Sequence, residues 1–366
     1  MATTTSRPTP AEIKRRIVDL LNAIRTRQQA FSFRLVSARL REHDMPTARG
    51  YDELLPKYKA LSLNNPRLPE FAKVLSGLYG DALFFSKRAV AFYEVNETQA
   101  RQIPAAFKAL VDADNPFSES YPFPVVPSIL RRASYAGKFV QAIVNEKVVR
   151  VIACAKRSYR ERDPILVDEL AEGARDALSG YDEIIGIKHG VVQAFDYMEY
   201  DRTSRILSVH IDICCAMGQD DFKKARMYYV KRVNEACGVE DGPETSIVVP
   251  KNLFPYVQRF YDAPDGKVGR LGHATGTDSV KAERMRTRRK DLRVEPFHKK
   301  GLEEIKTTDS FSIRKSWQAD DGQNHPTIEL PGHATDAGDP NAAIYYAIFD
   351  QCANEKEYKM LVGKLA

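Results

Sequence analysis

The sequence predicts an α+β protein with more than one domain. Near the N-terminus, apolar residues recur at the spacing of a helix face, whereas in the middle two runs of alternating apolar and polar residues flank a short turn. The length of 366 residues exceeds that of a typical single domain. We therefore expect a small helical domain over residues 1–95, a central α+β domain over 96–244 built on an antiparallel hairpin, and an irregular α+β C-terminal region over 245–366.

The N-terminal domain is predicted to be a set of short helices. Thr9, Pro10 and Glu12 form a helix start with a capping box, and an apolar stripe follows at Ile13, Ile17, Leu20, Leu21 and Ile24. Further helices are expected over residues 30–42, 52–61 and 69–78, and a tight hairpin over 82–93. The second helix exposes Arg34, Arg39 and Arg41, which would fit a DNA-binding helix-turn-helix. No residue identifies a recognition helix, so we prefer the interpretation that these helices form a packing bundle with solvated arginines.

The central domain is predicted to combine helices with an antiparallel sheet. Helices are expected over 98–112, 167–178 and 220–237, with a proline-rich connector over 115–128 and β-prone runs within 138–155. A long hairpin is expected with arms 191–200 and 205–213. If Tyr200 opposes Arg205, one face is apolar except for Asp196, which needs a partner if it is buried. The outer face of helix 220–237 is basic at Lys223, Lys224, Lys231 and Arg232 and could extend a positive patch.

The C-terminal region is predicted to alternate strands and helices. Strands are expected over 247–249, 267–274, 310–317 and 327–330, and helices over 253–261 and 341–352. Asn354 is a suitable cap for a last helix that ends near Leu365.

Positive charge is concentrated in residues 281–300. This stretch holds nine Lys or Arg and three Asp or Glu, a net charge of +6, which equals the net charge of the whole chain. Surface potential falls off within about 8–10 Å at physiological salt, so a concentrated patch attracts a polyanion where dispersed charges would not. We expect a nucleic-acid-binding protein, for DNA or RNA, that contacts phosphates through this basic patch without catalysis of its own. The expected contact residues are Arg284, Arg286, Arg288, Arg289, Lys290, Arg293, Lys299 and Lys300.

Several classes of protein are not indicated by the sequence. The chain has no apolar run of membrane-spanning length and no secretory signal at its start, so we expect a cytoplasmic protein without a membrane partner. The five cysteines form no metal-binding spacing, and no nucleotide-binding glycine motif occurs, so no cofactor is expected.

Two arrangements would support an alternative function, cleavage of phosphodiesters. Gly272-His273-Ala274-Thr275 recurs as Gly332-His333-Ala334-Thr335, and paired His-x-Thr elements resemble those of the 2H phosphoesterases. This resemblance, confined to these residues, implies that His273 and His333 serve as acid and base while Thr275 and Thr335 hold phosphate oxygens. The other arrangement is a Mg²⁺-dependent nuclease site that uses Asp182 and Asp212.

A third interpretation assigns the basic stretch to protein recognition. The same cations would suit an acidic surface on a protein partner, and the chain would then be a subunit of a complex. The sequence leaves open whether the protein is an enzyme.

Overall fold

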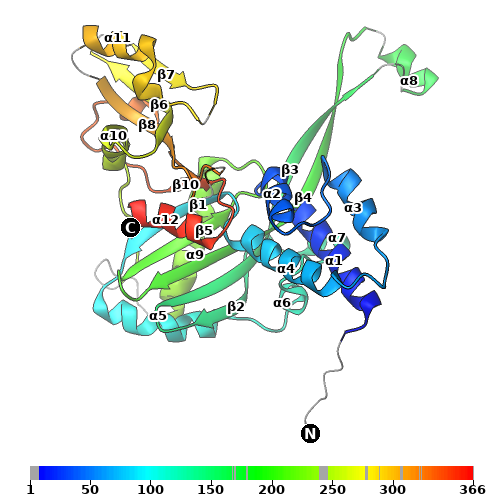
Figure 1. Ribbon diagram of the computed structural model, residues 1–366. Coiled ribbons are helices and arrows are strands. Elements are labelled where there is room, and N and C mark those ends of the chain that lie inside the picture. Colours follow the sequence, from blue (N-terminus) through cyan, green and yellow to red (C-terminus); the bar gives the residue numbers. More distant parts are fainter. Residues whose placement is uncertain are drawn as a thin grey trace.

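The computed structural model describes residues 8–166, 168, 170–178, 180–238, 246–276, 279–287, 289–305, 308–320, 322 and 324–365. In this part of the chain, ten strands form one antiparallel sheet in the order β2-β3-β4-β5-β1-β10-β9-β8-β6-β7, and helices pack around it (Figure 1). The predicted α+β class is confirmed.

Four helices form the N-terminal bundle: α1 (Pro10–Arg25), α2 (Phe33–Glu42), α3 (Tyr51–Lys59) and α4 (Leu68–Phe84). The predicted capping box is present, because the Thr9 hydroxyl accepts from the Glu12 N–H at 3.3 Å and Glu12 accepts from the Thr9 N–H at 2.7 Å. The predicted hairpin over 82–93 is wrong. Ala82 and Leu83 continue the buried stripe of α4, and the following residues form the single strand β1 (Arg88–Glu94) in the middle of the sheet.

The central region combines strands with helices, and these helices pack on both faces of the sheet. This region contains α5 (Glu97–Leu110), α6 (Pro116–Ser120), α7 (Pro127–Arg132), β2 (Lys138–Val144), β3 (Val148–Ile165), α8 (Glu172–Ala177), β4 (Ile184–Asp201), β5 (Ile206–Asp212) and α9 (Gln219–Ala236). Thus α6 and α7 interrupt the expected connector, and the predicted helix 167–178 is realised as the shorter α8; residues 167 and 169 of the predicted helix lie outside the described residues. Strands β3 and β4 continue beyond the sheet as a two-stranded arm that carries α8 at its tip (Figure 1).

The hairpin of β4 and β5 has the predicted faces but a different register. Met198 pairs with Val209, whereas the sequence predicted Leu207 as its partner. The turn is wider than expected, because the Asp201 carboxylate accepts from the Thr203 and Ser204 N–H groups and Arg205 has a positive φ of 57°. A shift of two residues leaves every side chain on its predicted face.

Asp196 is buried, and it has the partners that the sequence predicts for a buried carboxylate. It is 1% exposed and binds Arg157 at 2.6 Å, the Tyr229 hydroxyl at 2.7 Å and the Asp212 N–H at 2.7 Å. These contacts join β3, β4, β5 and α9 through one carboxylate.

The C-terminal region contains α10 (Pro255–Asp262), β6 (Lys267–Thr275), β7 (Val280–Arg284), η2 (Leu292–Val294), α11 (Pro296–Glu304), β8 (Thr308–Ser316), β9 (Thr327–Leu330), η3 (Ala334–Asp336), β10 (Ala347–Asp350) and α12 (Glu355–Leu365). Two predictions are wrong. Residues 247–249 are not in a strand, and the expected helix 341–352 contains strand β10. Pairing with β1 and β9 overrides the local helical pattern, since Ala347 and Phe349 are fully buried at the period of a strand.

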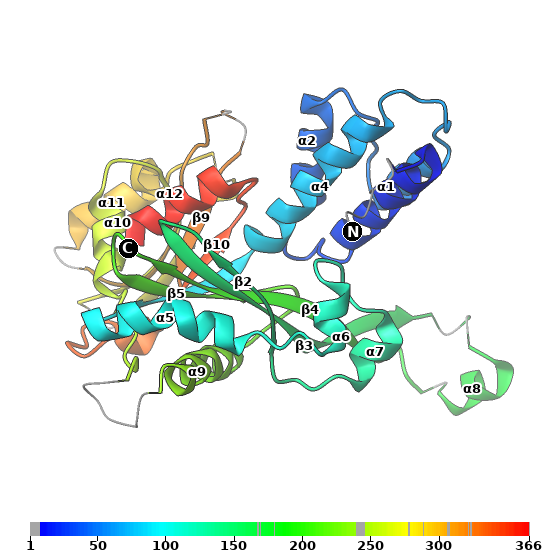
Figure 2. The same cartoon turned by 90° about the horizontal axis from the view of Figure 1, so that it is seen from below.

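Among the described residues, the three largest of four apolar clusters surround the sheet. Helices α5 and α9 pack on one face of the central strands, and the N-terminal bundle packs on the opposite face against β2, β3 and β4 (Figure 2). The third core lies between the C-terminal strands, α10 and α12. Because β10 pairs with β1, the sheet runs without interruption from the central strands into the C-terminal ones.

Candidate phosphate-binding groove and histidine cluster

The basic stretch 281–300 folds onto the C-terminal strands as the end of β7, η2 and most of α11. Five of the expected contact residues are exposed and have no ion pair with any carboxylate of the described residues: Arg284, Arg286, Arg289, Lys290 and Lys299. Lys300 is exposed but pairs with Glu303 at 2.8 Å. Arg288 lies outside the described residues.

Arg293 has a different environment from the other cations of the stretch. Its guanidinium binds Asp291 at 2.7 Å and donates to the carbonyl oxygens of Tyr261 at 3.1 Å and Gly266 at 2.9 Å. The side chain therefore connects η2 to the end of α10 and the start of β6, and these contacts use the donors that a phosphate would require.

Arg289 lines a groove between α2 and the C-terminal part of the protein. The groove has a volume of about 860 Å³. Six cations and three carboxylates lie among its lining residues, and the cations come from α2, the basic stretch and α12: Arg34, Arg39, Arg41, Arg289, Lys356 and Lys364. We call this the basic groove. The fold thus brings the exposed arginines of α2 next to the basic stretch, from which about 250 residues separate them.

The cations of the basic groove differ in how strongly they are held by neighbours. Arg34 donates to Asn324 at 2.8 Å and connects α2 to the C-terminal region. Lys364 pairs with Asp265 at 2.6 Å, and Lys356 pairs with Asp320. Within the described part of the chain, Arg41 and Arg289 have no such ion pair, so their donors are available to a ligand.

Arg39 lies near two carboxylates, of which Glu42 also lines the groove. It is 3.4 Å from Glu42 and 3.6 Å from Asp81. Burial raises the pKa of Asp81 to about 6, and the positive charge of Arg39 opposes this rise. Asp81 is therefore mostly ionised at pH 7 and reduces the positive potential at Arg39.

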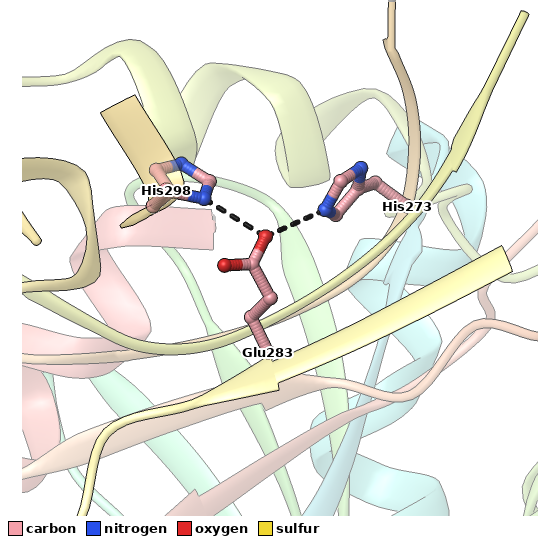
Figure 3. Close-up of side chains that lie close together, drawn as sticks. All are labelled: His273, Glu283 and His298. Carbon is pink, nitrogen blue, oxygen red and sulfur yellow. Dashed lines mark hydrogen bonds and ion pairs between the residues drawn. The ribbon is translucent and has the colours of Figure 1, made fainter. Parts of the chain in front are cut away.

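A cluster of two histidines and a glutamate lies next to the exposed cations of the basic stretch (Figure 3). His273 Nε2 and His298 Nδ1 contact the same oxygen, Glu283 Oε1, at 2.8 and 2.9 Å. We call these three residues the histidine cluster. In the described residues it is the one group of at least three His, Cys, Asp or Glu side chains whose ligand atoms all lie within 4.8 Å of one another.

Local structure places each residue of the histidine cluster. Glu283 on β7 pairs with Leu271 on β6, so its side chain lies diagonally across from His273 on the same face. The Glu295 carboxylate accepts from the His298 N–H at 2.7 Å and fixes the first turn of α11, which presents the His298 ring to Glu283. The pairing of β6 with β7 and the first turn of α11 therefore bring the three side chains together.

The cluster is mostly buried. His273 and His298 are 4% and 3% exposed, whereas the side chain of Glu283 is 19% exposed and gives access from solvent. Partial burial raises the pKa of Glu283, but the hydrogen bonds from both histidines outweigh this effect and lower it, so the carboxylate stays ionised. Imidazole nitrogens with a carboxylate oxygen are a ligand set of Zn²⁺ and related ions.

The two histidines of the phosphoesterase hypothesis have separate partners. His273 belongs to the histidine cluster, whereas His333 is exposed, with Nε2 2.9 Å from Gln219 Oε1 at the start of α9. Thr275 is buried at the end of β6, where its hydroxyl donates to the Ser279 carbonyl at 3.4 Å, and Thr335 is exposed in η3. The sequence marks His273 only through its His-x-Thr element. Its partners in the structure, Glu283 and His298, belong to no motif that the sequence reveals.

The structure does not bring Asp182 and Asp212 together. Asp212 is fully buried and accepts from Arg27 at 2.8 Å and from the Phe195 N–H at 2.9 Å. Asp182 is exposed and precedes β4 near the tip of the arm. Eleven residues of extended strand separate Ile184 from Phe195, which corresponds to about 36 Å.

Comparisons with known proteins give no family for this chain. No protein-family model matches it, and no curated protein is significantly similar to it. None of the described helices is both long and apolar enough to cross a membrane. The functional argument therefore rests on the side chains described above.

Proposed function

We propose that this protein binds nucleic acid by contacting phosphates in the basic groove and along the exposed part of the basic stretch. The observation that supports the proposal most strongly is the position of Arg289, which lies in one groove with the arginines of α2. Arginine binds phosphate through two parallel hydrogen bonds, and Arg41 and Arg289 have donors free of ion pairs with the described carboxylates.

The chemistry of the groove favours the phosphate backbone over the bases. Its cations lie on helices and on a turn anchored by Arg293, and Lys267 donates to the Arg289 carbonyl at 2.7 Å, so this turn is held in place. Contacts to phosphate fix a protein on nucleic acid but carry little sequence information. We therefore expect similar affinities for unrelated sequences of the same length and strandedness.

The proposal is tested by the salt dependence of binding. Fluorescence anisotropy with labelled single-stranded and duplex DNA and with RNA, over a range of KCl concentrations, gives the slope of log K against log salt. Each phosphate contact contributes about −0.9 to this slope for duplex DNA and about −0.7 for single strands. The double variant Arg41→Gln, Arg289→Gln should make the duplex slope less negative by about 1.8 and lower the affinity at 100 mM KCl at least tenfold.

A matched control removes two cations from a different face. Lys223 and Lys224 are exposed on α9, which covers the face of the sheet opposite the N-terminal bundle (Figure 2). The double variant Lys223→Gln, Lys224→Gln has the same net charge as the groove variant and should leave the slope nearly unchanged. Equal losses in both variants would mean that binding is diffuse, and an unchanged slope in the groove variant would refute the proposal.

The alternative functions predict other results in the same preparations. A subunit that docks on an acidic protein surface should bind a soluble poly-glutamate at least as tightly as DNA of equal charge. A paired-histidine phosphoesterase should cleave a labelled oligonucleotide and lose that activity in both His273→Ala and His333→Ala.

A further inference from the structure

We infer that the histidine cluster binds one divalent transition-metal ion of the Zn²⁺ type. This inference concerns His273, Glu283 and His298 and does not depend on the proposed function. The ligand set is two imidazoles and one carboxylate, which suits Zn²⁺ and its neighbours in the first transition row. Mg²⁺ and Ca²⁺ prefer sites made of oxygen ligands, so this cluster discriminates against them.

The geometry is close to that of a bound metal. Zn²⁺ holds nitrogen and oxygen ligands at about 2.0–2.1 Å, so the ligand atoms of a tetrahedral site lie about 3.3 Å apart. Glu283 Oε1 lies 2.8 Å from His273 Nε2 and 2.9 Å from His298 Nδ1. The three ligand atoms all lie within 4.8 Å of one another, so side-chain movements that bring the two histidine nitrogens to this spacing admit the ion. The two rings are 89° apart in orientation, so they approach the shared oxygen from different directions without stacking (Figure 3).

The surroundings of His298 are those of a metal-ligating histidine. His298 Nε2 is 2.8 Å from the Tyr261 hydroxyl. Metal binding displaces the Nδ1 proton that His298 donates to Glu283, and the ring proton then lies on Nε2, where the Tyr261 hydroxyl oxygen accepts it, as in the outer hydrogen bond of a metal-ligating histidine. His273 Nδ1 is buried and has no hydrogen-bond partner in the described residues, so His273 lacks the outer hydrogen bond that His298 has.

The ion would keep one free coordination position, and it would also connect separate elements of the fold. Three protein ligands leave a fourth position of the ion free for water, and the partly exposed Glu283 marks the side from which water enters. The ligands come from β6, β7 and α11, so the ion connects the two ends of the segment from Glu283 to His298. This segment carries most of the exposed cations of the basic stretch.

The test uses the full chain and Zn²⁺ itself. After removal of metal with a chelator, isothermal titration with ZnCl₂ should give one high-affinity site per chain, and Co²⁺ in its place should give the intense visible bands of a tetrahedral complex. His273→Ala, His298→Ala and Glu283→Gln should each weaken Zn²⁺ binding by more than 100-fold, because even outer-shell changes at metal sites cost about 10–100-fold. Tyr261→Phe, which removes only the outer hydrogen bond, should fall within that smaller range.

Two variants serve as controls, one for loss of the fold and one for the loss of a histidine outside the cluster. Glu283→Gln has the same size and keeps an oxygen that can accept from both histidines, so it separates loss of the anionic ligand from loss of the fold. His333→Ala removes an exposed histidine of the same region and should bind Zn²⁺ like the unmodified protein. The inference is overturned if the chain binds no Zn²⁺ in this range, if Mg²⁺ binds as tightly, or if the double variant His273→Ala, His298→Ala retains the site.

Discussion

The ion pair between Arg27 and Asp212 gives a prediction whose size follows from burial. Arg27 lies in the turn after α1, and its guanidinium is 2.8 Å from the Asp212 carboxylate on β5, with side chains 2% and 0% exposed. It also donates to the Ala82 carbonyl at 2.8 Å. Replacing Arg27 with Met keeps much of the volume but leaves a buried carboxylate without this partner. Loss of one member of a buried pair costs about 3–5 kcal/mol, so Arg27→Met should lower the free energy of unfolding by that amount at pH 7.

The pH dependence provides a second measure of the same interaction. Burial raises the pKa of Asp212, but the charges of Arg27 and Arg88 outweigh it and lower the pKa below its usual value. In the unmodified protein this carboxylate stabilises the fold above the unfolded pKa, and the stabilisation is lost as the pH falls through the lower folded pKa. In Arg27→Met burial should dominate and raise the folded pKa, so the stability deficit should shrink as the pH falls from 7 to 4.

Urea denaturation of four proteins tests this reasoning. The double variant Arg27→Met, Asp212→Asn should be less destabilised than the sum of the two single variants, because the buried charge is removed together with its partner. The control is the exposed pair of Arg25 and Asp52, with side chains 45% and 87% exposed, where Arg25→Met should cost about 1 kcal/mol or less. If Arg25→Met and Arg27→Met lose equal stability, burial does not determine the strength of these pairs and the argument fails.

Three further predictions follow from other contacts. Because the pKa of Asp81 is raised to about 6, stability should fall as the pH rises from about 4 to 6, and Asp81→Asn should therefore gain about 1–3 kcal/mol at pH 7 and nothing at pH 4 in urea titrations. Chelation of the inferred metal should weaken DNA binding in anisotropy assays in the unmodified protein but not in Glu283→Gln, a result that requires both proposals to hold. Thr9→Ala removes the cap of α1 and should lower the free energy of unfolding by about 1 kcal/mol, with calorimetry as the measurement.

The elements that the sequence predicted well are those whose local signals agree with their environment. Helix α1 has a capping box and an apolar stripe, and α9 begins with acidic residues and ends before Gly238, which has a positive φ of 66°. Strands β6, β8 and β9 also lie within a few residues of their predicted bounds. In these segments, periodicity, caps and burial all indicate the same structure.

The elements that the sequence predicted wrongly depend on distant partners. Strand β10 pairs with β1 and β9, which are about 260 and 20 residues away, and no local pattern records such pairing. The exposed arm of β3 and β4 was missed for a related reason, since the two strands pair along their whole length through residues rich in charge. Local patterns specify a segment, but they do not specify the segment that will lie beside it.

The candidate site could be predicted only in part for the same reason. The charge surplus of residues 281–300 is visible in composition, as are the arginines of α2, but their meeting in the basic groove follows from packing of the bundle beside α12. The histidine cluster joins residues at positions 273, 283 and 298, whose spacing matches no motif, and only the register of β6 with β7 and the cap of α11 bring them together.

The side chains of the basic stretch divide into an inward set and an outward set. Along β7, Lys281 and Glu283 are partly buried while Ala282 and Arg284 are exposed, as the two-residue period of a strand requires. The inward side chains hold the segment to the protein, as do Arg293 and His298 further on, and the outward cations remain for a partner. Deleting the stretch would therefore remove the structural support together with the proposed binding surface and could not distinguish them. Replacement of outward cations one at a time, with Glu283 and Arg293 left intact, isolates the contribution of charge to binding.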